Sequence, residues 1–357
     1  MKPSIESSLA VLGPEASADS LVYDALLFVS FGGPEGPDEV MPFLRRVTRG
    51  RDVPEERLLE VAKHYEALGG RSPINEQNRA FIAALDAELR QRGRDLPIRF
   101  GNRNWHPLLE TTLAELKAEG ARRVLAFVSS AFSSYSGCRQ YREDIAEALA
   151  AAGEGGPEVD KVRVFFNHPG FIEAVADRLR SAFATFPPEL RYDVAIVFTA
   201  HSIPKAMADR CSYVEQLREA ASLALESLGR RGGWELAFQS RSGPPSVPWL
   251  EPDILDVVRR LAAEGKPGLL VMPLGFLSDH VEVIYDLDHE ARDLAAELGL
   301  RFERAPTVGC HPAFVRAVAD LIEERLDPSR DRPALGRFGP REDQCPPGCC
   351  SPPRRQA

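Results

Sequence analysis

One histidine and three acidic residues have the types and the spacing needed to handle protons and a metal ion. His201 follows an apolar run in the segment TAHSIP, and Glu282, Asp286 and Glu290 recur at intervals of four residues. In an α-helix, these three carboxylates would lie on one face, about 6 Å apart along the axis. An imidazole and a carboxylate together can accept protons and hold a borderline cation such as Fe²⁺. The pattern fits either a track for a divalent metal or a solvated acidic helix face.

Short apolar runs precede these residues, as expected for buried strands. One run at 194–198 leads to His201, and another at 269–272 leads through Pro273 and Gly275 to the acidic segment. Similar runs alternate with helical patterns in the first half, which predicts parallel α/β units with right-handed crossovers. Ligands of such sheets bind beyond the carboxyl ends of the strands. We therefore expect His201 and Glu282 to face each other across a cleft.

The second half of the sequence repeats features of the first half in the same order. The segment YDVAIVFTAHSIP from Tyr192 resembles YDALLFVSFGGP from Tyr23, and FQSR at 238–241 resembles FGNR at 100–103. Chance remains the alternative, because the identities are few. The repeat predicts two similar α/β domains, at 21–155 and 156–330, with the glycine-rich segment 153–157 as linker. We expect residues 1–20 to be a flexible N-terminal tail and residues 331–357 to be a cysteine-rich C-terminal tail.

The bulk properties exclude several classes of protein. The chain has 357 residues and a formal net charge of -9, with a pI near 5.5, which argues against a nucleic-acid partner. No apolar run approaches the ~20 residues of a membrane span, so we expect no integral membrane segment. The N-terminal residues lack the pattern of a signal or transit peptide. These observations predict a cytoplasmic protein.

Three of the six cysteines, Cys345, Cys349 and Cys350, crowd a short segment that also contains Pro and Gly. Such a segment cannot form the core of a helix. It could be a reactive tail or a zinc clip, or it could contribute to an iron–sulfur cluster. A cluster needs four cysteine ligands, so the fourth would have to come from elsewhere in the chain.

Several motifs in the same order resemble the ferrochelatase family, whose members insert ferrous iron into a porphyrin. The motifs are SFGGP, GGRSPINEQN, SYSGCRQYRED, TAHSIP and SDHVEVIYDLDHE, and the similarity runs from about Tyr23 to Cys350. The resemblance implies two Rossmann-like domains of the chelatase type with a porphyrin cleft between them. It also implies a metal-inserting lyase of haem biosynthesis, with His201 and Glu282 as the catalytic pair at the iron site. Asp286 and Glu290 then match positions proposed as a route for the metal.

The resemblance also implies substrate contacts and cluster ligands. Ser72 and Tyr141 match porphyrin-contacting positions. Phe31 stands where many bacterial members carry Tyr, and its phenyl ring can pack against a macrocycle but cannot ligate iron axially. Cys138 is implied as the fourth ligand of a [2Fe–2S] cluster whose other three are Cys345, Cys349 and Cys350.

The QYRED segment and the cysteine tail look like those of Gram-positive bacterial ferrochelatases, which use coproporphyrin III. The loop after Phe31 is acidic and lacks the apolar lip of relatives that use protoporphyrin. Five arginines near the expected cleft could meet propionates: Arg45, Arg46, Arg49, Arg51 and Arg71. A solvated basic helix is the alternative for Arg45 and Arg46.

The expected substrates are therefore Fe²⁺ and coproporphyrin III, with transient contacts to neighbouring enzymes of the haem pathway. Three alternatives stay open. The chain could use protoporphyrin IX, it could insert cobalt or nickel into a different ring, or it could be a non-catalytic carrier of tetrapyrrole or metal on the same fold. A carrier needs no proton acceptor at the metal, so the presence of both His201 and Glu282 favours an enzyme.

Overall fold

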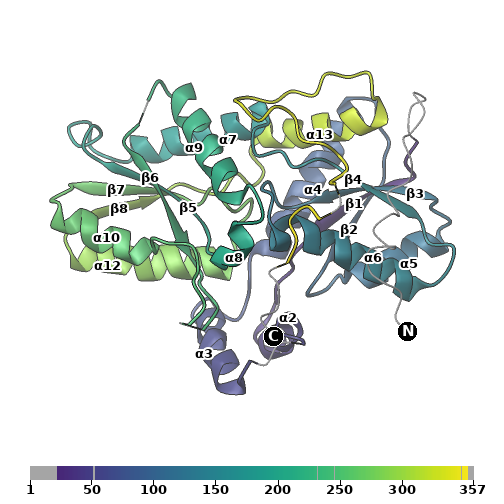
Figure 1. Cartoon of the computed structure of the whole chain (residues 1–357), viewed down its shortest axis with the longest axis horizontal. Helices are drawn as coiled ribbons and strands as arrows, with labels where there is room; N and C mark the ends of the chain where they lie inside the picture. Colours follow the sequence, from purple (N-terminus) through teal and green to yellow (C-terminus); the bar gives the residue numbers. More distant parts are fainter. Residues whose placement is uncertain (1–21, 51–52, 231, 245, 347, 353–357) are drawn as a thin grey trace.

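The structure is a computed structural model that describes residues 22–50, 53–230, 232–244, 246–346 and 348–352. These residues form two four-stranded parallel sheets with helices on both faces (Figure 1). The predicted tail at 1–20 and Arg51 lie outside the described residues. Within the described part of the chain, no helix is long and apolar enough to cross a membrane.

The first sheet has the strand order β2-β1-β3-β4. Its strands are β1 (Ala25–Ser30), β2 (Ile98–Asn102), β3 (Arg123–Val128) and β4 (Glu158–Lys161). The helices of this half are η2 (Pro37–Glu39), α2 (Val40–Val47), α3 (Glu55–Glu66), α4 (Ile74–Gln91), α5 (Leu109–Ala118), η3 (Tyr135–Arg139) and α6 (Gln140–Ala152). The register places Phe28 of the central strand β1 beside Phe100 and Phe127.

The second sheet has the equivalent order β6-β5-β7-β8. Its strands are β5 (Ala195–His201), β6 (Trp234–Gln239), β7 (Gly268–Met272) and β8 (Arg301–Arg304). The helices are α7 (Pro169–Ala184), α8 (Lys205–Ala208), α9 (Tyr213–Ser227), α10 (Ile254–Ala263), α11 (Val281–Val283), η4 (Ile284–Ala291), α12 (Arg292–Glu297) and α13 (Pro312–Leu326). The two sheets share one topology, which confirms the predicted duplication.

The strands β1 and β7 are mostly apolar and buried throughout because helices cover both faces of each sheet. Every residue of β1 is buried. Leu26 and Phe28 point into a core that both halves of the chain share, whereas Leu27 and Val29 pack against α5 and α6 on the other face. The side chains thus alternate with the period of two that a strand imposes.

The glycine-rich segment 153–157 is not a linker between the two sheets. It joins α6 to β4, and β4 pairs in parallel with β3. Gly153 and Gly155 have φ angles of 79° and 80°, which only glycine adopts without strain, so the sequence makes a tight turn within the first sheet. The first sheet therefore extends to Lys161, beyond the predicted domain boundary at 155.

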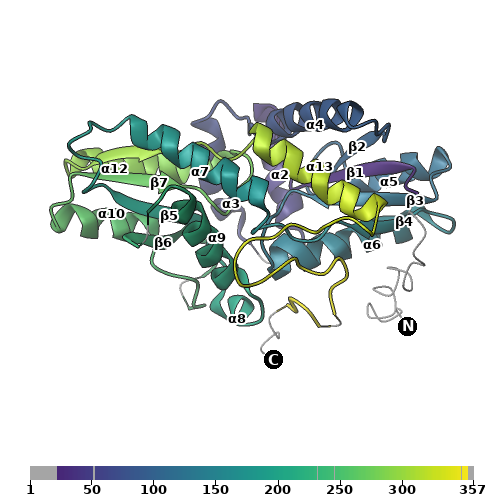
Figure 2. The same cartoon turned by 90° about the horizontal axis from the view of Figure 1, so that it is seen from above.

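The last long helix, α13, returns to the first half of the chain. The helix α7 follows the first sheet but packs against α9 and β7 of the second, while α13 follows the second sheet but packs against α4 of the first (Figure 2). The two helices also contact each other, and a Cβ atom on Gly170 would lie 2.6 Å from the carbonyl oxygen of Ala313. Glycine is therefore required at this crossing.

Candidate functional site

His201 and Glu282 meet where the strands β5 and β7 end. His201 is the last residue of β5, and Glu282 lies in the helix α11 that follows β7. The Nε2 atom of His201 lies 3.5 Å from the Oε2 atom of Glu282, and the two side chains are 33% and 46% exposed. Both groups are therefore accessible to a ligand, and the structure brings together the pair that we expected to face each other.

A hydrogen bond to the backbone orients the imidazole of His201. Its Nδ1 atom lies 2.5 Å from the carbonyl oxygen of Ser202, and a carbonyl can only accept, so Nδ1 carries the proton. In the neutral ring, Nε2 then presents its lone pair towards Glu282. This tautomer can accept a proton or ligate a metal on the exposed side.

The sequence predicts an ordinary α-helix for the three acidic residues, but the structure differs. Glu282 lies in the short helix α11, which continues into the π-helix η4 with Asp286 and Glu290. A π-helix has i→i+5 hydrogen bonds, and such turns occur frequently at functional sites. The buried faces of Val283, Leu287 and Ala291 hold this segment against the second sheet.

Two residues at the end of β6 fix the middle carboxylate. The hydroxyl of Ser240 donates to Asp286 Oδ2 at 2.5 Å, and Gln239 Nε2 donates to the same oxygen at 3.3 Å and to the carbonyl of Glu282 at 3.2 Å. Ser240 has a φ of 61°, a left-handed conformation that is uncommon for serine. Strain of this kind concentrates at functional sites.

The acidic row carries strongly perturbed carboxyl groups. Burial, with the added repulsion of Glu282 and Glu290, raises the pKa of Asp286 to about 8, although the hydrogen bond from Ser240 opposes this shift. Burial and the nearby Asp253 carboxylate also raise the pKa of Glu290. A cation that arrived at this row would relieve the repulsion and displace the proton of Asp286.

The loop after β7 connects this site to the first half of the chain. The backbone N–H of Asp279 donates to the side chain of Gln77 at 2.8 Å, and the Ser278 hydroxyl lies 3.4 Å from Asn78. Val281 packs with the apolar residues of α2 and α3, and His64 of α3 stacks on Tyr285 with ring centroids 3.8 Å apart. The helix pair α2–α3 thus packs against the acidic helix.

The predicted porphyrin contacts belong to the first half of the chain. Phe31 directly follows β1 and is 39% exposed. Tyr141, in the first turn of α6, is 5% exposed, and Ser72 is 3% exposed. The side chain of Ser72 lies so close to Gly33 that a Cβ atom on Gly33 would be 2.7 Å from Ser72 Cβ. Phe31 is therefore partly exposed, whereas Ser72 and Tyr141 lie mostly beneath the surface.

Three of the five predicted arginines make ion pairs with surface acids. Arg45 pairs with Glu55, Arg46 with Glu110, and Arg71 with Glu76, at 2.5, 3.1 and 2.9 Å. Exposed pairs of this kind are weak and easily exchanged. The contacts agree with the solvated alternative for Arg45 and Arg46.

The four predicted cluster cysteines are neighbours in space. Cys138 and Cys350 are buried, and the sulfur atoms of Cys349 and Cys350 are 3.7 Å apart. Hydrogen bonds from the thiols of Cys138 and Cys349 lower the pKa of Cys345, and the same bonds raise the pKa of each donor. The tail therefore brings its three thiols to Cys138 of η3, which the sequence alone could not establish.

Neither group of residues is a preformed metal cage. Among the described residues, no three side chains of His, Cys, Asp or Glu are arranged to hold a metal ion. The structure brings His201 and Glu282 together beside the acidic residues Asp286 and Glu290. The four neighbouring thiols form a separate group.

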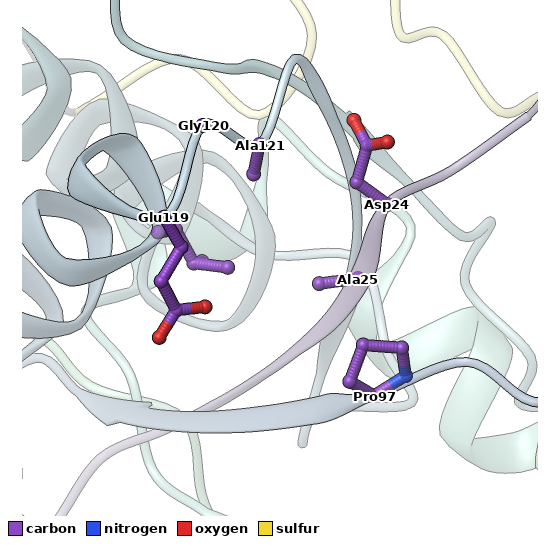
Figure 3. A pocket seen from close by; sticks show the side chains of 7 residues that line it. Asp24, Ala25, Pro97, Glu119, Gly120 and Ala121 are labelled. Carbon is purple, nitrogen blue, oxygen red and sulfur yellow. The ribbon is translucent and has the colours of Figure 1, made fainter.

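One cavity lies away from both groups. It has a volume of about 140 Å³ and lies at the amino ends of the strands in the first sheet, lined by Asp24, Ala25, Pro97, Leu116, Glu119, Gly120 and Ala121 (Figure 3). The Asp24 carboxylate accepts hydrogen bonds from the backbone N–H groups of Arg122 and Arg123. These bonds hold a turn, so Asp24 has a structural role.

Comparison with known proteins gives consistent matches. The family model described as Ferrochelatase matches residues 23–326. A ferrochelatase of Rhodopirellula baltica is 53% identical over 332 residues, which cover 92% of this chain and 93% of the relative. A coproporphyrin III ferrochelatase of Streptomyces griseus is 49% identical over 353 residues, which cover 93% and 94%.

A further relative and one solved structure extend these matches. A coproporphyrin III ferrochelatase of Frankia alni is 52% identical over 351 residues, covering 95% of this chain and 89% of the relative. The structure of SirB from Bacillus subtilis with Fe³⁺ matches with a TM-score of 0.56 at 13% identity, covering 86% of this chain and 97% of SirB. At 13% identity, the match to SirB supports the fold alone.

Proposed function

The chain belongs to the ferrochelatase family, and on this premise we propose that it inserts Fe²⁺ into coproporphyrin III to form iron coproporphyrin III (coprohaem). The protein is then a metal-inserting lyase of haem biosynthesis. The observation that carries the proposal is the 3.5 Å approach of His201 Nε2 to Glu282 Oε2 on two partly exposed side chains.

The reaction exchanges two pyrrole N–H protons for one Fe²⁺, so the site needs a proton acceptor and a place for the metal. His201 is the acceptor, because the bond of its Nδ1–H to Ser202 leaves Nε2 open. Glu282 carries the proton onward or presents the metal. Asp286 and Glu290 form the route by which the metal reaches Glu282, since a cation relieves the repulsion within the row.

The identity of the porphyrin rests on the relatives and on the chemistry of propionates. Several relatives about half identical to this chain are coproporphyrin III ferrochelatases. Ser72 and Tyr141 would act as neutral donors, and Phe31 would pack against the ring. Coproporphyrin III has four propionates, and a site built for them contains donors that protoporphyrin IX, with two, would leave unpaired.

The thiols gathered at the tail fit a [2Fe–2S] cluster as resident cofactor. Cys138, Cys345, Cys349 and Cys350 supply the four thiolates that such a cluster requires. Lys161, Arg139 and Arg142 lie close enough to lower the pKa values of thiols in this group, and this positive surrounding suits an anionic centre. Bound there, the cluster would cross-link the tail to η3; a zinc clip uses the same thiols and is the alternative.

We further propose that the protein acts in the cytoplasm and makes transient contact with neighbouring enzymes of the haem pathway. The acidic composition and the absence of a membrane-spanning helix in the described residues agree with this proposal.

Anaerobic assays with purified protein test the function directly. The protein is incubated with Fe²⁺ and either coproporphyrin III or protoporphyrin IX, and insertion is followed by the change in the porphyrin absorption bands. We expect turnover with both and a higher kcat/KM for coproporphyrin III. An equal or reversed preference would overturn the substrate assignment alone. Binding without insertion would indicate a carrier, and turnover only with Co²⁺ or Ni²⁺ would indicate a different chelatase.

A further inference from the structure

Arg103 lies beside two of the residues that are predicted to contact the porphyrin, Phe31 and Tyr141. It directly follows β2, next to Phe31 in the neighbouring strand-end loop, and its side chain is only 9% exposed. The backbone N–H of Arg103 donates to the carbonyl of Ser30 at 3.0 Å, which ties the loop after β2 to the end of β1. The backbone of Arg103 is therefore held next to that of Phe31.

The guanidinium contacts two aromatic rings from different elements. Its Cζ atom lies 4.8 Å from the ring centre of Tyr141 and 5.8 Å from that of Phe31. Both distances are within the range of cation–π attraction, which strengthens when the cation is removed from water. Arg103 thus contacts both the Phe31 and the Tyr141 ring.

An acidic residue and a backbone carbonyl complete the surroundings of Arg103. Its Nε atom lies 2.9 Å from Asp144 Oδ2 on α6. The two groups form an ion pair, but neither atom has a hydrogen-bond partner among the described residues. Its Nη1 atom donates to the carbonyl of Ser136 in η3 at 3.5 Å. One side chain thus contacts the loop after β1, the π-turn η3 and the helix α6.

We infer that Arg103 is a positioning residue that sets the distance between Phe31 and Tyr141, the two aromatic groups predicted to contact the porphyrin. This inference rests on the proposed function, because it assigns these rings to the substrate site. A planar guanidinium can contact two rings and a carboxylate at the same time, whereas an ammonium acts as a point charge. The position therefore requires arginine and not merely a cation.

Arg103→Met removes the charge and the planar group while keeping most of the length. We expect the KM for coproporphyrin III to rise about tenfold, because small displacements of substrate-positioning groups have effects of this order or larger. We expect the KM for Fe²⁺ to stay unchanged, since Arg103 belongs to the half of the chain that lacks His201 and Glu282. Arg103→Lys keeps the ion pair but loses the planar contact, so it should recover only part of the affinity.

Arg99→Met is the matched control. Arg99 lies on the same strand, β2, and pairs with the exposed Glu119 at 2.8 Å, away from both rings. This variant should behave as the unchanged protein. Asp144→Asn is the second test, used also if Arg103→Met fails to fold, and it should raise the porphyrin KM in the same direction by a smaller factor.

The split between the two KM values decides the inference. Equal changes for porphyrin and iron, full recovery in Arg103→Lys, or unchanged kinetics in the folded variants would overturn it. Fluorescence quenching by coproporphyrin III in the absence of iron provides a binding readout that is independent of turnover. If the unchanged protein neither binds nor metallates porphyrin, the proposed function fails instead, and the two failures are distinguishable.

Discussion

His201 Nε2 faces the Glu282 carboxylate at 3.5 Å although the two residues follow different strands, β5 and β7. We expect His201→Ala to lower iron insertion by at least ~100-fold, the usual scale for losing a general base. Glu282→Gln should be similarly damaging, because an amide neither holds Fe²⁺ well nor accepts a proton. Anaerobic turnover is the measurement, with circular dichroism and porphyrin binding to establish that the fold is intact. The control is Asp209→Asn, a change at an exposed residue that pairs with Lys205. Near-normal turnover in His201→Ala would contradict the assignment of His201 as proton acceptor.

The neighbouring thiols predict a coloured protein. With Cys138, Cys345, Cys349 and Cys350 intact, we expect thiolate-to-iron absorption in the visible range and two iron atoms per chain beyond any substrate iron. Replacing any one by Ser should bleach the protein and lower its stability, because the tail loses its cross-link. Cys211, whose thiol contacts the backbone carbonyls of Met207 and Ala208, should be replaceable without loss of colour. A colourless protein that contains zinc would favour the clip.

Tyr141 provides a test of substrate preference. Tyr141→Phe removes one hydroxyl and keeps the ring that contacts Arg103. We expect kcat/KM for coproporphyrin III to fall by more than that for protoporphyrin IX, by about 1 kcal/mol of transition-state stabilisation, the usual worth of one neutral hydrogen bond. Tyr135→Phe is the matched control, because the Tyr135 hydroxyl donates to Glu143 at 3.0 Å. Equal losses with both porphyrins would remove Tyr141 from the propionate contacts.

A buried ion pair anchors the segment that leads to the tail. Arg163 donates to both carboxylate oxygens of Glu324, at 2.7 and 2.8 Å, and the side chains are 0% and 3% exposed. Arg163→Met leaves the carboxylate buried with Arg332 3.6 Å away, so we expect a loss of about 3–5 kcal/mol in the free energy of unfolding. Replacing both residues, with Glu324→Leu added, should cost less than this.

Urea unfolding measures these differences. The exposed pair of Arg90 with Asp86 is the control, and Arg90→Met should change stability by less than about 1 kcal/mol. A double variant as unstable as Arg163→Met would contradict the expected penalty for an unpaired buried charge.

His168 predicts a dependence of stability on pH. Burial and the nearby Arg163 lower the pKa of His168 from 6.5 to about 3, while its Nδ1 atom accepts from the N–H of Gly170 at the start of α7. The unfolded chain binds a proton at this residue below pH 6.5 and the folded chain does not. This contribution to stability is therefore present above pH 6.5 and is lost as pH falls towards 3, with a slope of at most about 1.4 kcal/mol per pH unit.

His168→Asn should reduce the dependence of the free energy of unfolding on pH below 6.5, because asparagine can cap the helix without titrating. The measurement is urea unfolding at pH 4.5, 5.5 and 7 for both proteins. An unchanged slope would show that another group dominates the loss of stability in acid.

The buried strands were predictable because both faces of each sheet are covered. The apolar runs that became β1, β5 and β7 stand out for that reason. Composition could not distinguish a linker at 153–157 from a turn, because glycines at 153 and 155 suit a tight turn equally well. The π-helix was missed because Val283, Leu287 and Ala291 recur every four residues, a spacing that either kind of helix can bury.

The site was predictable only in part, because several contacts depend on tertiary structure. The resemblance and the strand ends pointed to His201 and Glu282. The hydrogen bonds of Gln239 and Ser240 to Asp286 join different strand ends, and their only signal in the sequence was the repeat of FGNR as FQSR. Arg103 lies in the first copy of that repeat, but its contacts with Phe31 and Tyr141 required the packing of α6 against the first sheet.

The packing of α13 against α4 means that neither half of the chain carries all of its own core. A fragment that ended at Lys161 would keep the first sheet but lose Phe314, whose ring lies 5.3 Å from that of Phe81 on α4. Each half would then expose an apolar helix face that the other half normally covers. The protein should consequently unfold as one cooperative unit, and cutting the chain between the sheets should yield two pieces that fold only when they are mixed.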